Sequence, residues 1–298
     1  MQGKRDYTIR LRGGLMGFST PRVMGIINAT PDSFYAGSRS IGRCGAVATA
    51  MLADGADILD IGAFSTRPGA DEVSADEEYS RLAAALEDIR HCDPDAVISV
   101  DTFRADIARK VVGEFNVDII NDIGGGTLDP EMRDTVAELG VPYILMHTRG
   151  TPSTMQQLTD YSDVCADVLS DLAFKVDDFR QAGVHDIIVD PGFGFAKTVG
   201  QNYSLLAALD MFHQTGCPVL AGLSRKTMLW KPLGITPEEA GDATVAANTL
   251  AIANGADILR VHDVRPAVQA CRIFYLLSQN APSPFQIRTF DTQQDPLT

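Results

Sequence analysis

GADILDI (residues 55–61) and GADILRV (residues 255–261) repeat one pattern in two distant parts of the chain. Looser copies are NVDIIND (residues 116–122) and GVHDIIVD (residues 183–190). Each copy begins with a Gly or Asn, which commonly ends a preceding helix because it tolerates a left-handed backbone. The short apolar run that follows does not alternate cleanly and ends in a polar residue. This predicts a strand that is buried on both faces.

Four more apolar runs of this kind lie at residues 23–27, 97–100, 142–146 and 218–221. Stretches with helical periodicity separate the runs, at residues 46–53, 77–89, 107–112, 132–139, 161–181, 203–212, 237–253 and 265–277. Eight strands alternating with eight helices fit the ~250 residues of a closed (β/α)8 TIM barrel, an α/β fold. An open doubly wound sheet usually carries GxGxxG after its first strand, and none follows Ile27. We therefore predict the barrel.

Two segments lie outside the predicted barrel strands and helices. TIRLRGGLMG (residues 8–17) is typical of a β-hairpin with Gly13 and Gly14 at the turn, and it could plug the amino-terminal mouth of the barrel. The polar, proline-containing segment after Asn280 is expected to be an extension. We predict one barrel domain over residues 1–280, with the hairpin at about 7–18, and a C-terminal extension over 281–298.

Composition narrows the class of protein. The net charge of −14 disfavours nucleic-acid binding, because an acidic surface repels phosphate backbones. We expect no membrane span, since no apolar run reaches eighteen residues, and no secretory signal, since the first residues lack an apolar core. The five cysteines are scattered without a CxxC pair, which indicates neither a disulfide framework nor a zinc site. A cytoplasmic protein is expected.

Polar residues follow the predicted strands, where TIM barrels place their chemistry. They are Asn28, Asp60, Asp101, Asn121, Asp122, His147, Asp190, Ser224, Arg225, Lys226, Arg260 and His262. Structural alternatives stay open for single members: Asp60 could bond only to the backbone of a neighbouring loop, and His147 could be a satisfied structural histidine. As a set they predict a polar site at one face of the barrel.

The residue types indicate the ligand. Asp101, Asn121 and Asp190 can donate and accept in one plane, which matches a flat heterocycle with adjacent amino, N–H and carbonyl groups. Lys226 and Arg260, with His262 and Arg67, suit an anion, and barrels often hold phosphate at their last strands. We infer a heterocycle that carries a phosphate or diphosphate.

Seven motifs extend this interpretation. They are MGIINATPDSFYAGSRS, DIGAFSTRPGADEVSADEEYSRL, SVDTFR, IINDIGGG, VDPGFGFAKTVGQNYSLL, GLSRKTM and RVHDV. In this order, from about Val23 to Phe274, the chain resembles the dihydropteroate synthase family of pterin-binding enzymes. The resemblance implies condensation of 6-hydroxymethyl-7,8-dihydropterin diphosphate with p-aminobenzoate in folate biosynthesis. It also implies a homodimer formed through helices late in the barrel.

The resemblance implies a role for each matched residue. Asp101, Asn121, Asp190 and Lys226 would hold the pterin ring, and Asn28 would coordinate a Mg²⁺ cofactor. Arg260 and His262, helped by Arg67, would bind the diphosphate. The p-aminobenzoate site would be lined by Thr66, Arg67, Pro68, Phe195, Lys226 and Thr227. Lys226, Asp101, Arg260 and His262 would act in catalysis.

The chain departs from the family pattern in two loops, at residues 30–39 and 64–73, which we expect to act as mobile lids. Ala36 stands where an acidic residue is expected, and Ala63-Phe64 replaces Gly-Glu. The chain could close its lids differently from its relatives, or be a paralogue with weakened synthase activity. A pterin-dependent methyltransferase and a non-catalytic pterin-binding protein are further alternatives. Neither needs the diphosphate grip that Asn28 and the SRK and RVHDV segments offer.

Overall fold

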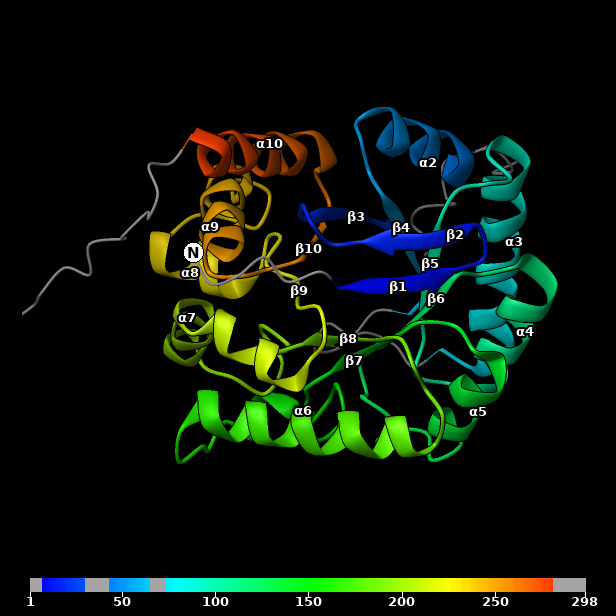
Figure 1. Cartoon of the computed structure of the whole chain (residues 1–298), viewed down its shortest axis with the longest axis horizontal. Coiled ribbons are helices and arrows are strands. Elements are labelled where there is room, and N and C mark those ends of the chain that lie inside the picture. The colour runs from blue at the N-terminus through cyan, green and yellow to red at the C-terminus, as the bar shows by residue number, and fades with distance from the viewer. Residues whose placement is uncertain (1–6, 30–42, 65–72, 281–298) are drawn as a thin grey trace, which may run out of the picture.

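A ring of parallel strands forms the centre of the molecule in the computed structural model, which describes residues 7–29, 43–64 and 73–280 (Figure 1). The strands are β3 (Arg22–Asn28), β4 (Ile58–Gly62), β5 (Ile98–Asp101), β6 (Ile119–Asp122), β7 (Tyr143–Met146), β8 (Ile187–Asp190), β9 (Leu220–Ala221) and β10 (Ile258–Val261). They pair in the order β8-β7-β6-β5-β4-β3-β10-β9. A parallel bridge between Val189 and Val219 joins β8 to β9 and closes the ring. The predicted TIM barrel is confirmed.

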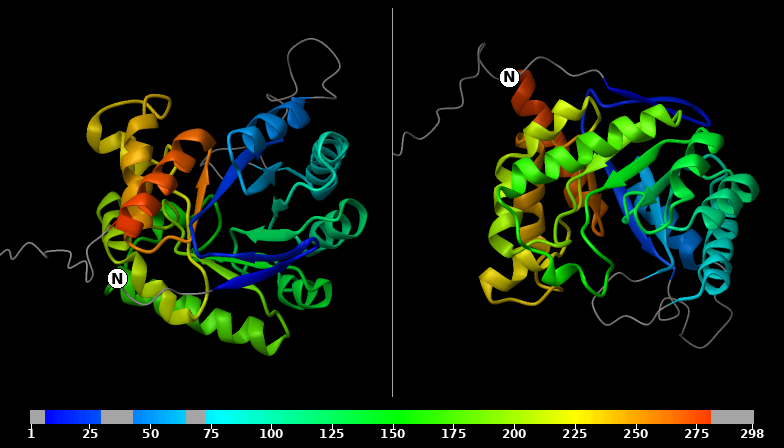
Figure 2. Two further views of the ribbon diagram at one scale, coloured as in Figure 1. Left: turned by 45° about the horizontal axis from the view of Figure 1, so that its top comes forward. Right: turned by 90° about the horizontal axis from the view of Figure 1, so that it is seen from below.

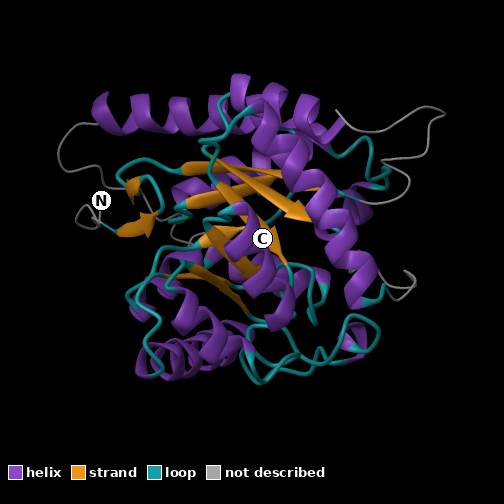
Figure 3. Cartoon of the chain, turned by 90° about the vertical axis from the view of Figure 1, so that its right-hand side faces the viewer, coloured by secondary structure: helices purple, strands orange, loops and turns teal. Residues whose placement is uncertain are grey.

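Helices cover the outside of this ring, as Figures 2 and 3 show. They are α2 (Arg43–Ala53), α3 (Ala75–Cys92), α4 (Ala105–Phe115), α5 (Met132–Leu139), α6 (Val164–Gln181), α7 (Val199–Ala207), α8 (Thr227–Leu233), α9 (Gly241–Ala253) and α10 (Val264–Asn280), with 3-10 turns η1 (Met155–Gln157) and η2 (Leu209–Thr215). The helix predicted at 203–212 was wrong in its bounds. A capping box of Thr198 and Gln201 starts α7 earlier, and the rest of the stretch belongs to η2.

Left-handed residues precede the repeated strands, as the sequence pattern predicted. Asn116 has φ +52° directly after α4. Gly55, Gly183 and Gly255 have φ between +99° and +104°. Glycine reaches these angles at little steric cost, so the chain can turn from each helix straight into the next strand.

Alternation along the strands creates the interior of the barrel, because successive side chains point to opposite faces. The first inward residues form an apolar layer with Met24, Ile58, Ile119, Ile144, Ile188, Leu220 and Ile258. Two residues further along, the same inward face carries Asp60, Asn121, Asp190 and Arg260. The period of two therefore separates an apolar floor from a polar chamber above it.

A hairpin of β1 (Thr8–Leu11) and β2 (Gly14–Gly17) covers the amino-terminal end of the barrel (Figure 1). Ile9 and Phe18, exposed by 1% and 5%, pack against the apolar floor. The predicted plug is confirmed, but its turn lies one residue earlier than expected. Leu11 pairs with Gly14, so Arg12 and Gly13 form the turn and Gly14 belongs to β2.

In the described ranges no helix has the length and apolar character needed to cross a membrane. The predicted extension, residues 281–298, lies outside the described residues.

Candidate active site

One hydrogen-bonded cluster spans the polar chamber above the apolar floor. Oδ2 of Asp60 accepts from Nε of Arg260 at 2.6 Å and from Nδ2 of Asn121 at 3.1 Å. Nη2 of Arg260 donates to Oδ2 of Asp101 at 2.8 Å. The Asp60 side chain is fully buried, whereas that of Asp101 is 19% exposed. The cluster joins β4, β5, β6 and β10 and opens towards the carboxyl ends of the strands at Asp101.

The positions of three members of the cluster differ from the prediction. Asp60, Asn121 and Arg260 lie inside β4, β6 and β10 rather than after them. Asp60 bonds to side chains across the barrel, so the alternative in which it meets only loop backbone is wrong. Each of these strands continues past the residue named.

Burial and neighbouring charges shift the pKa values of the ionisable groups in this cluster. Burial raises the pKa of Asp101 to about 7, against the pull of Arg260, and the charge of Asp60 raises it further. Burial by itself would lower the pKa of Arg260, but Asp60 and Asp101 outweigh it and the pKa is raised. Arg260 therefore stays charged at any working pH, while Asp101 can change its protonation state near neutrality.

A second group of polar atoms surrounds the end of β8. Oδ1 of Asp190 accepts from the Gly192 N–H at 2.7 Å. Nζ of Lys226 donates to the Phe193 carbonyl and lies 5.0 Å from the centroid of the Phe195 ring. Burial lowers the pKa of Lys226 to about 8, although the charge of Asp190 opposes this. Gly222 lies beside both groups, since a Cβ there would be in ordinary van der Waals contact with them, 4.0 Å from Asp190 Oδ2 and 3.7 Å from Lys226 Nζ.

The ends of β9, β10 and β3 add further groups at the same rim. Oγ of Ser224 lies 2.9 Å from Nδ1 of His262 and accepts from the His262 backbone N–H at 3.2 Å. Thr227 starts α8 directly after Lys226. Asn28 is exposed at the end of β3, whose neighbours are β4 and β10. The predicted residues at the strand ends thus gather at one end of the barrel.

Comparisons with known proteins agree with this geometry. Residues 24–262 match the family model described as pterin binding enzyme. Dihydropteroate synthase of Synechocystis sp. is 44% identical over 256 residues, covering 84% of this chain and 88% of that protein. The dihydropteroate synthase of Xanthomonas albilineans, solved with 4-aminobenzoic acid, superposes with a TM-score of 0.85 at 37% identity, over 93% of this chain and 100% of that one. The chain belongs to the dihydropteroate synthases of the pterin-binding family.

The same Xanthomonas enzyme in complex with 7,8-dihydropteroate gives a TM-score of 0.81 at 34% identity, again over 93% of this chain and 100% of that chain. The family resemblance drawn from seven motifs is therefore confirmed. The relatives named here, from Synechocystis and Xanthomonas, are dihydropteroate synthases, which favours a synthase over the methyltransferase alternative.

Several predicted site residues of this dihydropteroate synthase lie outside the described residues. They are Thr66, Arg67 and Pro68 of the second loop. Ala36 of the first loop, which stands where an acidic residue was expected, also lies outside them. The ends of the second loop are described. The Phe64 ring meets the Phe103 ring edge-on with centroids 5.6 Å apart, and Nη2 of Arg104 donates to the Val73 carbonyl at 2.8 Å. Both ends of the loop thus contact the segment that follows Asp101. Phe64, which stands where an acidic residue was expected, packs against the Phe103 ring.

A buried lysine in the DPGFGFAK motif was missed by the sequence reasoning. Nζ of Lys197 lies 3.0 Å from Nδ1 of His147 and donates to the carbonyls of Gly192 and Phe195 at 2.9 Å each. Burial lowers the pKa of Lys197 to about 7 and that of His147 to about 2, so His147 is neutral. These contacts favour the structural reading of His147. Spacing gave no signal for Lys197, because it follows a loop rather than a strand.

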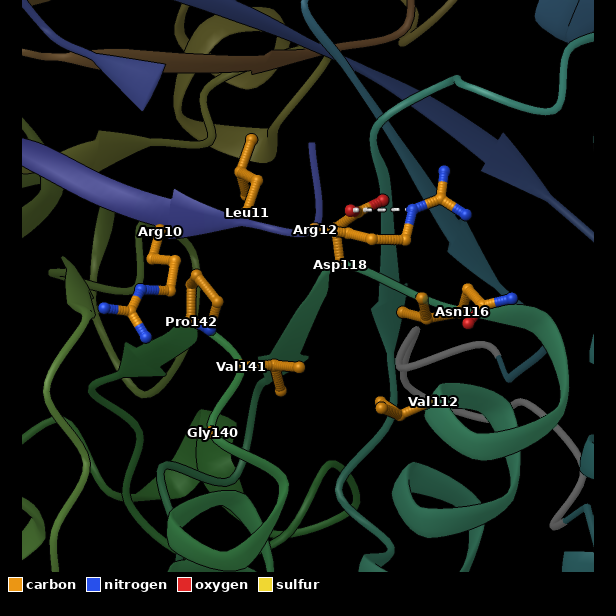
Figure 4. A pocket seen from close by; sticks show the side chains of 10 residues that line it. Arg10, Leu11, Arg12, Val112, Asn116, Asp118, Gly140, Val141 and Pro142 are labelled. Carbon is orange, nitrogen blue, oxygen red and sulfur yellow. Dashed lines mark ion pairs between the residues drawn. The ribbon is translucent and has the colours of Figure 1, made fainter. Parts of the chain in front are cut away.

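A cavity of about 220 Å³ lies at the other end of the barrel, under the hairpin (Figure 4). Arg10, Leu11, Val141 and Pro142 line it, and Nε of Arg12 lies 4.0 Å from Oδ1 of Asp118 at its edge. None of the predicted site residues lines it.

Proposed function

We propose that this chain condenses 6-hydroxymethyl-7,8-dihydropterin diphosphate with p-aminobenzoate to give 7,8-dihydropteroate and diphosphate. The chain is a transferase of the dihydropteroate synthase type. The observation that carries the proposal is the chamber itself, in which carboxylates, an amide, a guanidinium and an ammonium face one interior space. Relatives that fit this fold were solved with 4-aminobenzoic acid and with 7,8-dihydropteroate.

The pterin ring occupies the chamber in this proposal. Asp101, Asn121 and Asp190 come from β5, β6 and β8 and offer acceptors for the amino and N–H edge of the ring. Lys226 offers an ammonium to a ring nitrogen and carbonyl, and it lies beside Asp190, whose charge acts on it. A buried acceptor without a donor costs about 1–3 kcal/mol, so these groups favour a ligand of matching polarity.

The diphosphate lies at the rim beside β10 and β3. His262 is oriented by Ser224, and Arg260 carries a permanent positive charge one layer below. The described residues contain no group of three His, Cys, Asp or Glu that could hold a metal ion. The amide oxygen of Asn28 nevertheless fits Mg²⁺, which prefers hard oxygen donors and often takes few protein ligands besides phosphate and water. Mg²⁺ bound there would neutralise charge on the departing diphosphate.

The reaction breaks the C–O bond at the pterin methylene, and its electron pair leaves with the diphosphate. His262 and Arg260 stabilise that negative charge. The ionised carboxylate of Asp101 stabilises positive charge developing at the methylene. The neutral aryl amine forms the C–N bond with its lone pair and then loses a proton to the departed diphosphate or to water, so the protein needs no nucleophilic side chain. Phe195, Lys226 and Thr227 line the amine's side of the site.

Mixing the protein with the pterin diphosphate, p-aminobenzoate and Mg²⁺ tests the proposal. Stoichiometric release of pyrophosphate and formation of dihydropteroate are expected. Product without normal rates would indicate the weakened paralogue. Tight pterin binding without pyrophosphate release would favour the methyltransferase or the non-catalytic binder and refute the synthase. Titration with pyrophosphate alone provides a control, since a simple pterin binder gives no Mg²⁺-dependent heat.

We also propose that the protein is a homodimer. Ile273, Leu276 and Leu277 of α10 are 65%, 53% and 52% exposed, and their spacing places them on one face of the helix. Leu250 of the adjacent α9 is 56% exposed. Such a patch suits a second copy of the chain. Analytical ultracentrifugation should give a dimer for the native chain and a monomer for Ile273→Glu, and a native monomer would refute the proposal.

A cytoplasmic setting is the last part of the proposal. All five cysteines are free, and Cys44 and Cys217 are buried. Unpaired thiols fit a reducing compartment better than an oxidising one. Localisation of a tagged chain outside the cytoplasm would refute this.

A further inference from the structure

We propose that Asp60 is a positioning residue, whose carboxylate holds Arg260 and Asn121 in one fixed arrangement beneath the substrates. The inference rests on the proposed function. Asp60 does not contact substrate in it, but acts through two residues that do.

The geometry of Asp60 is that of a bridge. Its Oδ2 accepts from Arg260 Nε at 2.6 Å and Asn121 Nδ2 at 3.1 Å, from strands β10 and β6. In the ring, β3 separates β4 from β10, and β5 separates β4 from β6. Both hydrogen bonds therefore pass through the interior of the barrel rather than joining neighbouring strands. Oδ1 of Asp60 makes no hydrogen bond to the described residues. Among the described residues, this fully buried carboxylate therefore accepts hydrogen bonds from Arg260 and Asn121 alone.

Each partner is oriented by the bridge. Because Nδ2 of Asn121 donates to Asp60, its amide oxygen is the atom left to accept from a pterin N–H. Arg260 is fixed at two points, by Asp60 at Nε and by Asp101 at Nη2. Two contacts set the plane of the guanidinium, so its charge has a defined direction when the diphosphate arrives.

The charge of Asp60 also reaches Asp101 through this cluster. The ionisable groups that act on Asp101 are Arg260 on β10, Asp60 on β4, Glu78 on α3, Asp122 on β6 and Lys226 at the start of α8. Asp60 raises the pKa of Asp101, and it also shares Arg260, which lowers that pKa. Removing the charge of Asp60 therefore lowers the pKa of Asp101 by both routes. Since Asp101 acts as a carboxylate, the acid limb of kcat/KM should move to lower pH.

The isosteric variant Asp60→Asn tests the proposal. The pH profile of kcat/KM for the pterin diphosphate should show at least a tenfold loss at its optimum and an acid limb shifted down by at least half a pH unit. The KM for p-aminobenzoate should change less than twofold. Ser99→Ala is the matched control: Ser99 pairs in register with Asp60, is fully buried, and has no hydrogen-bond partner among the described residues. It should behave like the native enzyme.

A double-mutant cycle with Arg260→Lys separates positioning from general damage to the fold. The loss caused by Asp60→Asn should be at least fivefold smaller in the Arg260→Lys background. A native-like profile for Asp60→Asn, or an unmoved acid limb with an equal loss in both backgrounds, overturns the inference. If Asp60→Asn fails to fold, Asp60→Glu is measured in its place. Because glutamate keeps the negative charge, kcat/KM should fall at least tenfold while the acid limb of its pH profile stays where it is in the native enzyme. A native enzyme that makes no dihydropteroate would instead refute the proposed function.

Discussion

Replacing Gly192 with alanine tests how closely the loop after β8 must approach the end of β7. A Cβ on Gly192 would lie 2.0 Å from the carbonyl oxygen of His147, where contacts under 3.0 Å essentially do not occur. Gly192 also has φ +71°, a left-handed angle that side chains rarely adopt. The backbone must therefore move by about 1 Å, and that distance is enough to cost on the order of 100-fold in a catalytic site.

The expected loss of stability follows from the same contacts. The left-handed angle costs roughly 1–2 kcal/mol for alanine. The N–H and C=O of Gly192 bond to Asp190 and Lys197, and weakening both bonds adds about 1–2 kcal/mol. A total near 3 kcal/mol corresponds to a fall in Tm of roughly 6–12 °C in a chain of this size. Because Asp190 moves with the loop, kcat/KM for the pterin diphosphate should fall about 100-fold.

Circular dichroism melting and steady-state kinetics measure the two effects. Gly200→Ala is the control, because Gly200 lies in α7 and a Cβ there meets nothing within 4 Å. It should keep the native rate and the native Tm, or raise the Tm slightly. A Gly192→Ala enzyme with native Tm and kcat/KM would refute the reasoning that the loop is held by close packing on β7.

Four further predictions concern Lys226, His262 and the hairpin. Burial lowers the pKa of Lys226 to about 8, so its ammonium is lost as pH rises through that value and kcat/KM should decline above it. Lys226→Ala should remove turnover at every pH with an unchanged circular dichroism spectrum, and near-normal kcat/KM would contradict its role. His262→Ala should weaken calorimetric binding of pyrophosphate at least tenfold, and equal affinity would argue against a diphosphate contact. Ile9→Ala should cost about 2–4 kcal/mol in urea unfolding, whereas Leu15→Ala, at a position 73% exposed on the same hairpin, should cost under about 0.5; equal losses would disprove the plug.

Much of the barrel could be predicted because its strands are short apolar runs set off by Gly or Asn. Periodicity located the strands well, since a strand buried on both faces has few polar interruptions. It failed at α8, where seven residues that include Pro232 give no clear helical pattern. It also missed the boundary of α7, which depends on a cap formed by Thr198 and Gln201 rather than on apolar spacing.

The site was predictable as a set of residues but not as a network. Reading one residue past each apolar run found Asp101, Asn121 and Asp190, because the last inward position of a strand faces the chamber. The partners of these groups come from distant parts of the chain. No local pattern therefore predicts that Asp60 bonds to Arg260 or that Lys197 contacts His147. The pairing of Phe64 with Phe103 is of the same kind, since it depends on two loops that the barrel brings together.

The hairpin closes the amino-terminal end of the barrel. Because Ile9 and Phe18 complete the lower apolar layer, whatever enters the polar chamber of the described barrel must come and go by the opposite rim. A heterocycle bound deep in that chamber is then trapped behind any aromatic amine that settles above it. Because both reactants enter by the same opening, the deeper one should bind first. A compound that occupies both positions would block the entry of either reactant and inhibit the enzyme.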